Sequence, residues 1–255
     1  MDTPTLSTMV VLYYTNLKFN TTTIMNDLPL DNIIIKVEKR GVAKRGESKR
    51  DKIKRRVKKD APTETHNTTG FCHNSITVVV LNNGDGVLPD KEITIKIFQN
   101  GVFHLTGVLD ERYDTCAMRD LLTVLWTNCR HAITDAPENY EILRRRTVLM
   151  NYTTKLTSND TVAREVLHNT IREMNNPLIT SHYDPDVYPG VKIHIGPNNW
   201  TAKVFRTGKI ILTGITDSDQ CAEFMIQLQT LFERVLPSKS MPQTRSIPAV
   251  LPLKM

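Results

Sequence analysis

The residues best suited to chemistry in this chain occur twice, in two stretches of fifteen residues that are identical at seven positions. The first stretch, ITIKIFQNGVFHLTG, begins at Ile93, and the second, WTAKVFRTGKIILTG, begins at Trp200. Each copy reads as two strands around a turn, and side chains on a strand alternate between its two faces. The shared threonines, lysine and phenylalanine therefore lie on one face. That face offers hydroxyl groups, a cation and an aromatic ring, which can bind a ligand but do not break bonds.

The opposite face of this repeated hairpin is apolar and is expected to meet an amphipathic helix. It consists of Ile95, Ile97, Phe103 and Leu105 in the first copy and Ala202, Val204, Ile210 and Leu212 in the second. No helix is left over to cover the polar face. A solvated face with one stray aromatic residue would explain a single hairpin. Its recurrence at matched positions indicates a binding surface.

The sequence has none of the motifs that mark a catalytic or metal centre. GxSxG, HExxH and phosphate-binding loops are all missing. The pairs Cys72-His73 and Cys129-Arg-His131 have no second pair at zinc spacing. No CxxC pair occurs either, which is typical of a reducing compartment. We expect a protein that is not an enzyme, with no catalytic residues, no cofactor and no metal.

The net charge of +6 conceals one strongly basic segment. Between Lys36 and Lys59 there are thirteen Lys and Arg residues against three acids, so the remainder of the chain is slightly acidic. Such a segment cannot build a core, and we interpret Lys39–Gly70 as a mobile insertion. A solvated tail, a nuclear-import signal and a clamp on DNA phosphates all fit this composition.

The hairpins need other elements to position them, and the sequence supplies the same set twice. In the first half the strand patterns lie at 8–19, 33–37 and 76–81, with a short helix or turn at 21–32 and a helix through 116–129. In the second half the strands lie at 147–156 and 191–195, and the helices at 161–174 and 221–235. Asp160 is the expected cap of the helix at 161–174, and Asn100-Gly101 fits a two-residue turn.

This repeated order predicts an α+β fold in which helices cover one face of an antiparallel sheet. A period of about a hundred residues indicates a duplicated domain and not a solenoid. We expect repeat one at residues 1–135 and repeat two at residues 136–240. Residues 241–255 form a Pro-rich C-terminal tail.

Two motifs resemble those of a known family. VFRTGKIILTG is similar to IF-x-(S/T)-G-K-(I/M)-V-x-T-G, the hairpin signature of the TATA-box-binding proteins, and IFQNGVFHLTG matches it with Val102 in place of lysine. YDPDVYPG, from Tyr183 to Gly190, resembles the stirrup Y-E-P-E-L-F-P-G of that family. The resemblance covers most of the chain apart from Lys39–Gly70 and the last residues. The insertion and the drifted first repeat resemble the divergent members found in large DNA viruses.

The resemblance implies a saddle, in which two tandem repeats form one curved antiparallel sheet with helices on the convex face. Proteins of this family bind the DNA minor groove with the concave face, insert aromatic rings at two base steps and bend the duplex. The chain would then be a general transcription initiation factor at AT-rich promoters. The implied DNA-binding residues are Thr8, Val10, Phe71, His73, Lys96, Phe98, His104, Thr106, Asn151, Thr153, Tyr188, Lys203, Phe205, Ile211 and Thr213.

Within that set, the resemblance gives the aromatic residues the task of insertion. Phe98 and Phe205 match one inserting phenylalanine in each repeat. Tyr188 takes the place of the second ring in repeat two, and Phe71 or His73 takes it in repeat one.

The remaining residues of the set match the groove-reading positions or depart from them. Asn151 matches the groove-reading asparagine of the family, and Thr8 stands at the equivalent place in repeat one. Lys96, Lys203 and His104 replace apolar family residues. A lysine there can reach a phosphate, but it can equally weaken the aromatic wedge.

The resemblance also implies partners. Asp184, Asp186 and Val187 of the stirrup would contact a TFIIB-like factor that leads to the RNA polymerase machinery, although solvated turn charges explain them as well. No membrane is expected as a partner, because the apolar run near the N-terminus is too short to span a bilayer. The expected location is inside the cell, in the nucleus or, for a viral protein, the viral factory or virion. Two other functions stay open, a protein-interaction scaffold with little specific DNA binding and the substrate-binding domain of an enzyme.

Overall fold

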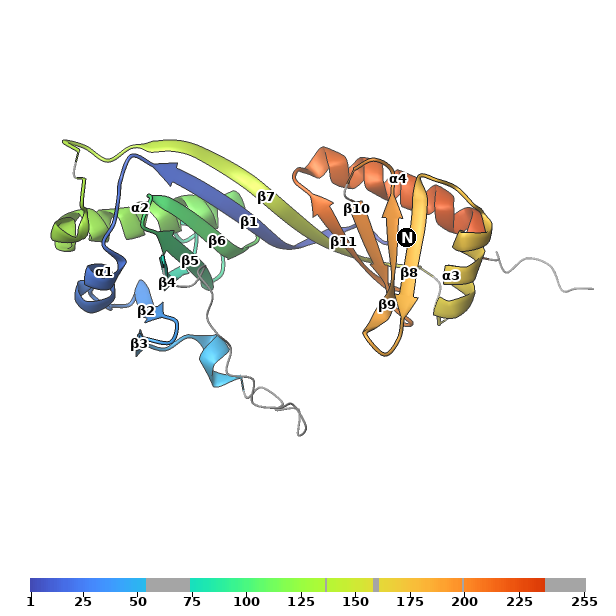
Figure 1. The fold of residues 1–255 in the computed structure, drawn as a ribbon, viewed down its shortest axis with the longest axis horizontal. Helices are drawn as coiled ribbons and strands as arrows, with labels where there is room; N and C mark the ends of the chain where they lie inside the picture. The colour runs from blue at the N-terminus through green and yellow to red at the C-terminus, as the bar shows by residue number, and fades with distance from the viewer. Residues whose placement is uncertain (54–73, 136, 158–160, 199, 237–255) are drawn as a thin grey trace, which may run out of the picture.

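One antiparallel sheet runs through the whole molecule (Figure 1). The computed structural model describes residues 1–53, 74–135, 137–157, 161–198 and 200–236. Within these ranges the sheet has eleven strands in the order β3-β2-β4-β5-β6-β1-β7-β11-β10-β9-β8. No helix in the same ranges is long and apolar enough to cross a bilayer.

The elements predicted from the sequence are present, and β3, β8 and two 3-10 helices are additional. The first half contains β1 (Thr5–Thr15), α1 (Thr21–Asp27), β2 (Ile34–Lys39), β3 (Ala43–Gly46), the 3-10 helix η1 (Lys49–Lys52), β4 (Ser75–Asn82), β5 (Lys91–Phe98), β6 (Val102–Val108), α2 (Glu111–Asn128) and the 3-10 helix η2 (Arg130–Ala132). The second half contains β7 (Ile142–Lys155), α3 (Arg164–Glu173), β8 (Ile179–Asp184), β9 (Tyr188–Ile195), β10 (Trp200–Val204), β11 (Lys209–Ile215) and α4 (Ser218–Val235).

The sheet is built symmetrically around two central strands, β1 and β7. These strands are antiparallel neighbours, and Thr8 of one is the cross-strand partner of Asn151 of the other. Outward from this centre, β6, β5, β4 and β2 on one side correspond to β11, β10, β9 and β8 on the other. The predicted pair of tandem α+β repeats is therefore confirmed. β3 lies at the outer edge of repeat one and has no counterpart among the described strands.

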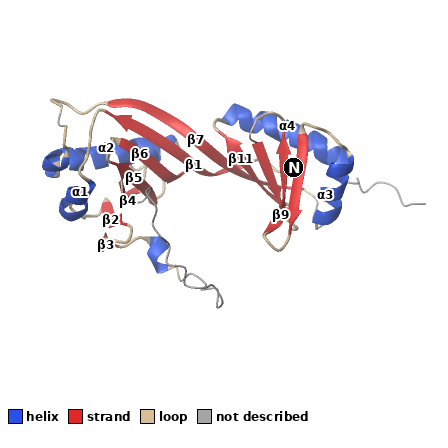
Figure 2. Cartoon of the chain, viewed as in Figure 1, coloured by secondary structure: helices blue, strands red, loops and turns tan. Residues whose placement is uncertain are grey.

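Each repeat buries a core between its half of the sheet and its helices (Figure 2). In repeat one α2 contacts β4, β5 and β6, and in repeat two α3 contacts β8 and β9 while α4 contacts β11. The predicted apolar face of both hairpins is confirmed, since each of its residues, such as Phe103 and Leu212, is 0% exposed. Burying a side chain of this size contributes about 1.5–3 kcal/mol, so the alternation of apolar residues decides which face the helices cover.

The long helices of the two repeats begin in the same way. Asp110 precedes α2 and accepts a hydrogen bond from the backbone N–H of Arg112, and Asp217 precedes α4 and accepts one from Gln220. A carboxylate in this position satisfies a free N–H group and favours the positive end of the helix dipole. α3 has no such cap, because its N-cap residue is Ala163. The prediction of Asp160 as its cap is wrong, and Asp160 itself lies outside the described residues.

The hairpin turns are one residue longer than the sequence predicts. The backbone N–H of Gly101 donates to the carbonyl of Phe98 at 3.1 Å, and that of Gly208 donates to the carbonyl of Phe205 at 3.0 Å. The two glycines have φ angles of 80° and 77°, in the left-handed region that glycine adopts without strain. A turn followed by such a residue is a three-residue loop, so the two-residue turn at Asn100-Gly101 is wrong.

The basic insertion is folded at its beginning. β3 pairs antiparallel with β2, and η1 follows it. The expectation of a mobile segment from Lys39 onward is therefore wrong for residues 39–53, and residues 54–70 lie outside the described part of the chain. The reason is that two of the three acids within the basic run, Glu38 and Asp51, pair with its cations. Lys36, only 6% exposed, forms ion pairs with Glu38 and with Asp51.

Candidate nucleic-acid interface

We call the face of the sheet opposite the α-helices the underside. On the hairpins it is formed by Thr94, Lys96, Phe98, His104 and Thr106 in repeat one and by Thr201, Lys203, Phe205, Ile211 and Thr213 in repeat two. These side chains are half-buried, except for the more buried Thr201, whereas the alternate residues of the same strands are fully buried in the cores. The predicted common face is confirmed. Contact of these residues with DNA stays a prediction.

The strand register arranges the underside of repeat two in rows that cross the sheet. One row starts at Thr153 on β7 and continues through Ile211 on β11 and Lys203 on β10. It then reaches Lys192 on β9 and His182 on β8. Cations thus stand next to one another on neighbouring strands of this face. Close like charges are unfavourable unless an anion lies between them. Such a cluster of cations is typical of a surface that binds a polyanion.

A matching row crosses repeat one. Lys96 on β5 pairs with His104 on β6 and with Thr77 on β4. On the central strands the row continues to Leu12 and Arg146, because Leu12 pairs with both His104 and Arg146. The two lysines that differ from the family pattern, Lys96 and Lys203, hold the same place in their rows.

Two further cations lie on this surface, Arg144 and Arg146, which were not among the predicted DNA-binding residues. Both are exposed, and they flank Arg145, whose side chain turns to the helix side. There Arg145 binds the fully buried carboxylate of Asp114, with Nε at 2.7 Å from Oδ2, and Tyr13 donates its hydroxyl to the same oxygen at 2.7 Å. Alternation along β7 therefore directs Arg144 and Arg146 to the underside. The run of three arginines directly before the predicted strand at 147–156 was the available signal.

Repeat two carries the predicted pair of aromatic rings. The ring centroids of Tyr188 and Phe205 lie 5.8 Å apart, and the Lys192 ammonium lies 5.2 Å from the centroid of the Tyr188 ring. Gly190 allows this approach, because a Cβ atom there would stand 3.0 Å from Tyr188 and 3.3 Å from Phe205. Both rings are half-buried, so part of each remains accessible at the end of the hairpin.

Phe98 holds the place of Phe205 in repeat one. It ends β5, is half-buried and pairs with Ser75 across the strands. Its predicted aromatic neighbour, Phe71 or His73, lies outside the described residues.

The centre of the underside is polar. Thr8 and Asn151 are partners across β1 and β7, with Val10 and Thr153 two residues further along their strands. All four side chains are half-buried. The side-chain oxygen of Asn151 is buried and has no hydrogen-bond partner among the described residues. A buried acceptor without a donor is unfavourable for a fold, so this oxygen atom adds nothing to stability in the free protein.

The electrostatic environment of the underside favours an anion. Burial and the nearby charge of Lys96 lower the pKa of His104. Glu38 and Glu92 also lie on this face, but both are engaged. Glu38 pairs with Lys36, and the carboxylate of Glu92 accepts a hydrogen bond from the backbone N–H of Lys49. Within the described residues, no group of three or more His, Cys, Asp or Glu side chains is placed to hold a metal ion.

The stirrup residues form a tight turn between β8 and β9. The carboxylate of Asp184 accepts hydrogen bonds from the backbone N–H groups of Asp186 and Val187 at 3.1 and 3.4 Å. Asp184 therefore shapes the turn, whereas the side chain of Asp186 is exposed and Val187 is 77% exposed. The equivalent connection in repeat one, between β2 and β4, is the basic insertion. The two ends of the molecule thus carry unlike loops.

Comparison with known proteins agrees with this arrangement. The family model described as "Transcription factor TFIID (or TATA-binding protein, TBP)" matches residues 167–234, which lie in repeat two. No curated protein matches the chain. Among solved structures, Methanococcus jannaschii TBP is similar with a TM-score of 0.54 and 13% sequence identity, over 92% of this chain and 100% of that one. The likeness shows a TBP-like fold, and residues 167–234 are similar to the TATA-binding protein family.

Proposed function

We propose that this protein binds AT-rich promoter DNA in the minor groove through its underside and bends it. The family match and the fold suggest a DNA-binding transcription factor. Minor-groove binding and bending are supported by the composition of the underside. It presents hydroxyls, cations and aromatic rings at matched positions in both repeats, as in Thr106 and Thr213 or Lys96 and Lys203.

The chemistry of this face fits the minor groove. Over A·T pairs that groove offers only acceptors, the N3 atom of adenine and the O2 atom of thymine. The hydroxyls of Thr106 and Thr213 can donate to such atoms. Lys192, Lys203, Arg144 and Arg146 are long enough to reach the phosphates that flank the groove, and each phosphate bound in this way adds affinity without sequence preference.

Bending follows from the aromatic residues. Phe205 with Tyr188 in repeat two, and Phe98 in repeat one, stand near the hairpin ends on opposite sides of the symmetric sheet. A ring that enters a base step unstacks it at a cost of about a few kcal/mol, and the bent duplex then offsets this by touching more protein surface. Two wedges at separate steps would kink the duplex twice in one direction.

The exposed stirrup fits the binding of a second protein. We assign Asp186 and Val187 to contact with a TFIIB-like factor, which would connect the complex to the RNA polymerase machinery. The protein would act without catalysis, inside the cell and in the nucleus, or in a viral factory if its source is a virus.

A titration with fluorescent AT-rich and GC-rich duplexes tests this function. Donor and acceptor dyes at the two duplex ends report bending, and a salt series reports the binding of phosphates. We expect tighter binding to the AT-rich duplex, and energy transfer that rises on binding. Phe205→Ala should keep most of the affinity but reduce the energy transfer. Equal and weak binding to both duplexes without bending would favour a protein-interaction scaffold instead.

A matched variant separates insertion from folding. Phe224 of α4 is 0% exposed in the core of repeat two, so Phe224→Ala should cost about 3–5 kcal/mol of unfolding free energy. Phe205→Ala should cost much less, because its ring lies on the underside. If both variants melt at the same lowered temperature, Phe205 is a core residue and not a wedge.

A further inference from the structure

The underside of repeat one is covered where that of repeat two is open. Val79 lies between two core residues of β4 and so faces the underside, yet it is only 3% exposed. Its counterpart in repeat two is His194, because Val79 pairs with Thr94 as His194 pairs with Thr201. His194 is exposed. Another part of the chain therefore shields Val79.

The same difference holds one strand further out. Lys36 on β2 pairs with Val79 and is 6% exposed, whereas Thr180 on β8 pairs with His194 and is exposed. A lysine is seldom buried to this degree on a free sheet face. The shielded region thus spans two neighbouring strands of repeat one.

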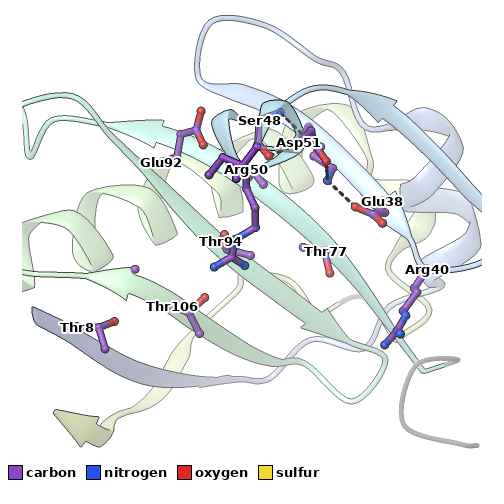
Figure 3. A pocket seen from close by; sticks show the side chains of 14 residues that line it. Thr8, Glu38, Arg40, Ser48, Arg50, Asp51, Thr77, Glu92, Thr94 and Thr106 are labelled. Carbon is purple, nitrogen blue, oxygen red and sulfur yellow. Dashed lines mark hydrogen bonds and ion pairs between the residues drawn. The ribbon is translucent and has the colours of Figure 1, made fainter. Parts of the chain in front are cut away.

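Among the described residues, η1 and its preceding residue Ser48 lie over this region, since Asp51 of η1 pairs with Lys36. Together with the sheet, η1 encloses a hollow of about 820 Å³ (Figure 3). Figure 3 shows the side chain of Arg50 extending from η1 toward Thr94 on β5. The sheet side of the hollow includes Thr8, Thr77, Thr94 and Thr106. Thr8 and Thr106 belong to the set expected to contact DNA.

Specific contacts hold η1 in this place. The backbone N–H of Lys49 donates to both carboxylate oxygens of Glu92 on β5, at 2.9 and 3.0 Å. Asp51 lies 3.0 Å from the Lys36 ammonium and 3.2 Å from that of Lys44. Hydrogen bonds from the backbone and hydroxyl of Ser48, and then the Lys36 ammonium, hold the pKa of Asp51 well below its usual range. Asp51 is therefore a carboxylate under all ordinary conditions.

DNA in the minor-groove mode needs the same surface. A base edge must come within about 3 Å of a hydroxyl to form a hydrogen bond. Thr94 and Thr106 line the hollow on its sheet side, and η1 lines it on another side and limits access to the two threonines. We propose that residues 48–52 are an intramolecular occupant of the repeat-one underside, which duplex DNA must displace before both repeats can bind. This inference rests on the proposed function.

The interactions that η1 would give up are of a displaceable kind. The partly exposed Lys44–Asp51 pair and the single hydrogen bonds each contribute little net free energy, and the departure of η1 also returns the buried Lys36 ammonium to water. The released cations, such as Lys44 and Arg50, can then pair with phosphates. Repeat two has no such cover among its described residues, so the duplex would meet repeat two first and repeat one second.

A pair of charge-matched variants tests the displacement. Asp51→Ala removes the carboxylate that holds η1, and Glu47→Ala removes a neighbouring exposed carboxylate that has no ion pair within the described residues. Both raise the net charge equally, so both strengthen phosphate attraction equally. A tenfold preference for the docked state lowers apparent affinity about tenfold, so Asp51→Ala should bind an AT-rich duplex up to that factor more tightly than Glu47→Ala.

A second variant and a second readout guard against simple misfolding. Glu92→Ala removes the acceptor on the sheet and should act like Asp51→Ala, although it lies on a different element. Amide hydrogen exchange over residues 47–53 reports docking directly, without DNA. Exchange should be faster in Asp51→Ala and Glu92→Ala than in Glu47→Ala, and saturating duplex should speed it in the wild-type chain.

The outcomes separate this inference from the proposed function. If every form binds AT-rich duplex with the same affinity, the protein binds DNA but η1 does not compete. Weaker binding by Asp51→Ala than by Glu47→Ala, with slower exchange on DNA addition, would show that η1 grips the duplex, which overturns displacement. If no form binds any duplex, the proposed function fails and the displacement fails with it.

Discussion

Thr8 and Asn151 face each other across the two central strands, where the two repeats meet. One residue comes from each repeat, and the resemblance to TATA-box-binding proteins placed them at equivalent positions. In a sheet with two-fold pseudo-symmetry, the axis passes between the two central strands, and the equivalent residues at the axis lie opposite each other. The pairing therefore supports the alignment of the two halves independently of the repeated hairpins.

The carboxamide of Asn151 should prove costly for stability and necessary for binding. Its buried oxygen lacks a donor among the described residues, an arrangement worth about 1–3 kcal/mol against the fold. Asn151→Leu, of similar size, should therefore melt at the same or a higher temperature. Its affinity for an AT-rich duplex should fall, as read from fluorescence anisotropy. A variant that loses stability but keeps its affinity would mean that the asparagine serves the fold.

The three consecutive arginines of β7 should behave in alternation. Arg144→Gln and Arg146→Gln should leave melting unchanged and each reduce the slope of log K against log salt by about one, because one phosphate fewer is neutralised. Arg145→Gln leaves the fully buried Asp114 carboxylate without its cation, at a cost of about 3–5 kcal/mol of unfolding free energy. Circular dichroism melts and salt titrations of the three variants check this. Similar effects from all three would contradict the assigned faces.

DNA affinity should depend on pH through His104. Its lowered pKa keeps the free protein neutral at this position near pH 7, whereas bound phosphates raise the pKa of a neighbouring imidazole. The bound state then holds more protons, so affinity should rise as pH falls from about 7 to 5.

Free-protein stability moves the other way over that interval. The lowered pKa of His104 makes its contribution to the unfolding free energy present above about pH 6.5, the unfolded value, and lost as pH falls through the folded value. Binding is therefore measured well below the melting temperature at each pH. His104→Gln should remove part of the pH dependence of affinity. Superimposable pH profiles for this variant and the wild type would exclude the residue from the interface.

The stirrup should separate DNA binding from partner binding. Asp186→Arg reverses an exposed charge that forms no side-chain hydrogen bond or ion pair within the described residues, so DNA affinity should stay nearly constant. A TFIIB-like partner should lose binding through charge mismatch. Asp184→Arg is the contrasting variant. It removes the acceptor of two backbone hydrogen bonds in the turn, so it should also lower the melting temperature. Gel-shift assays with and without the partner distinguish the two results.

The hairpins, their faces and the main helices were predictable because local alternation and repetition encode them. Phe103 and Leu105 alternate with His104 in a pattern that needs no knowledge of distant residues. The placement of Arg144 and Arg146 was not predictable in the same way. It depends on a distant residue, Asp114 of α2, which binds Arg145 and so fixes which face of β7 each arginine occupies.

The folded part of the insertion was hidden for a related reason. A count of like charges treats Lys36 and Asp51 as members of one solvated run. Only the fold shows that β2 and η1 bring them together as an ion pair. Sequence composition reports the sum of charges, whereas stability depends on their pairing.

The unlike loops at the two ends of the molecule bear on direction. A body with two-fold pseudo-symmetry can sit on a near-symmetric stretch of DNA in either of two orientations, and base contacts alone would separate them poorly. The connection between β8 and β9 is a short turn, whereas the one between β2 and β4 carries β3 and η1. A second protein that fits only the short turn meets the same end of the saddle every time. The direction of transcription from the promoter would then be set by which loop of the protein binds the partner, and not by the bases that contact the sheet.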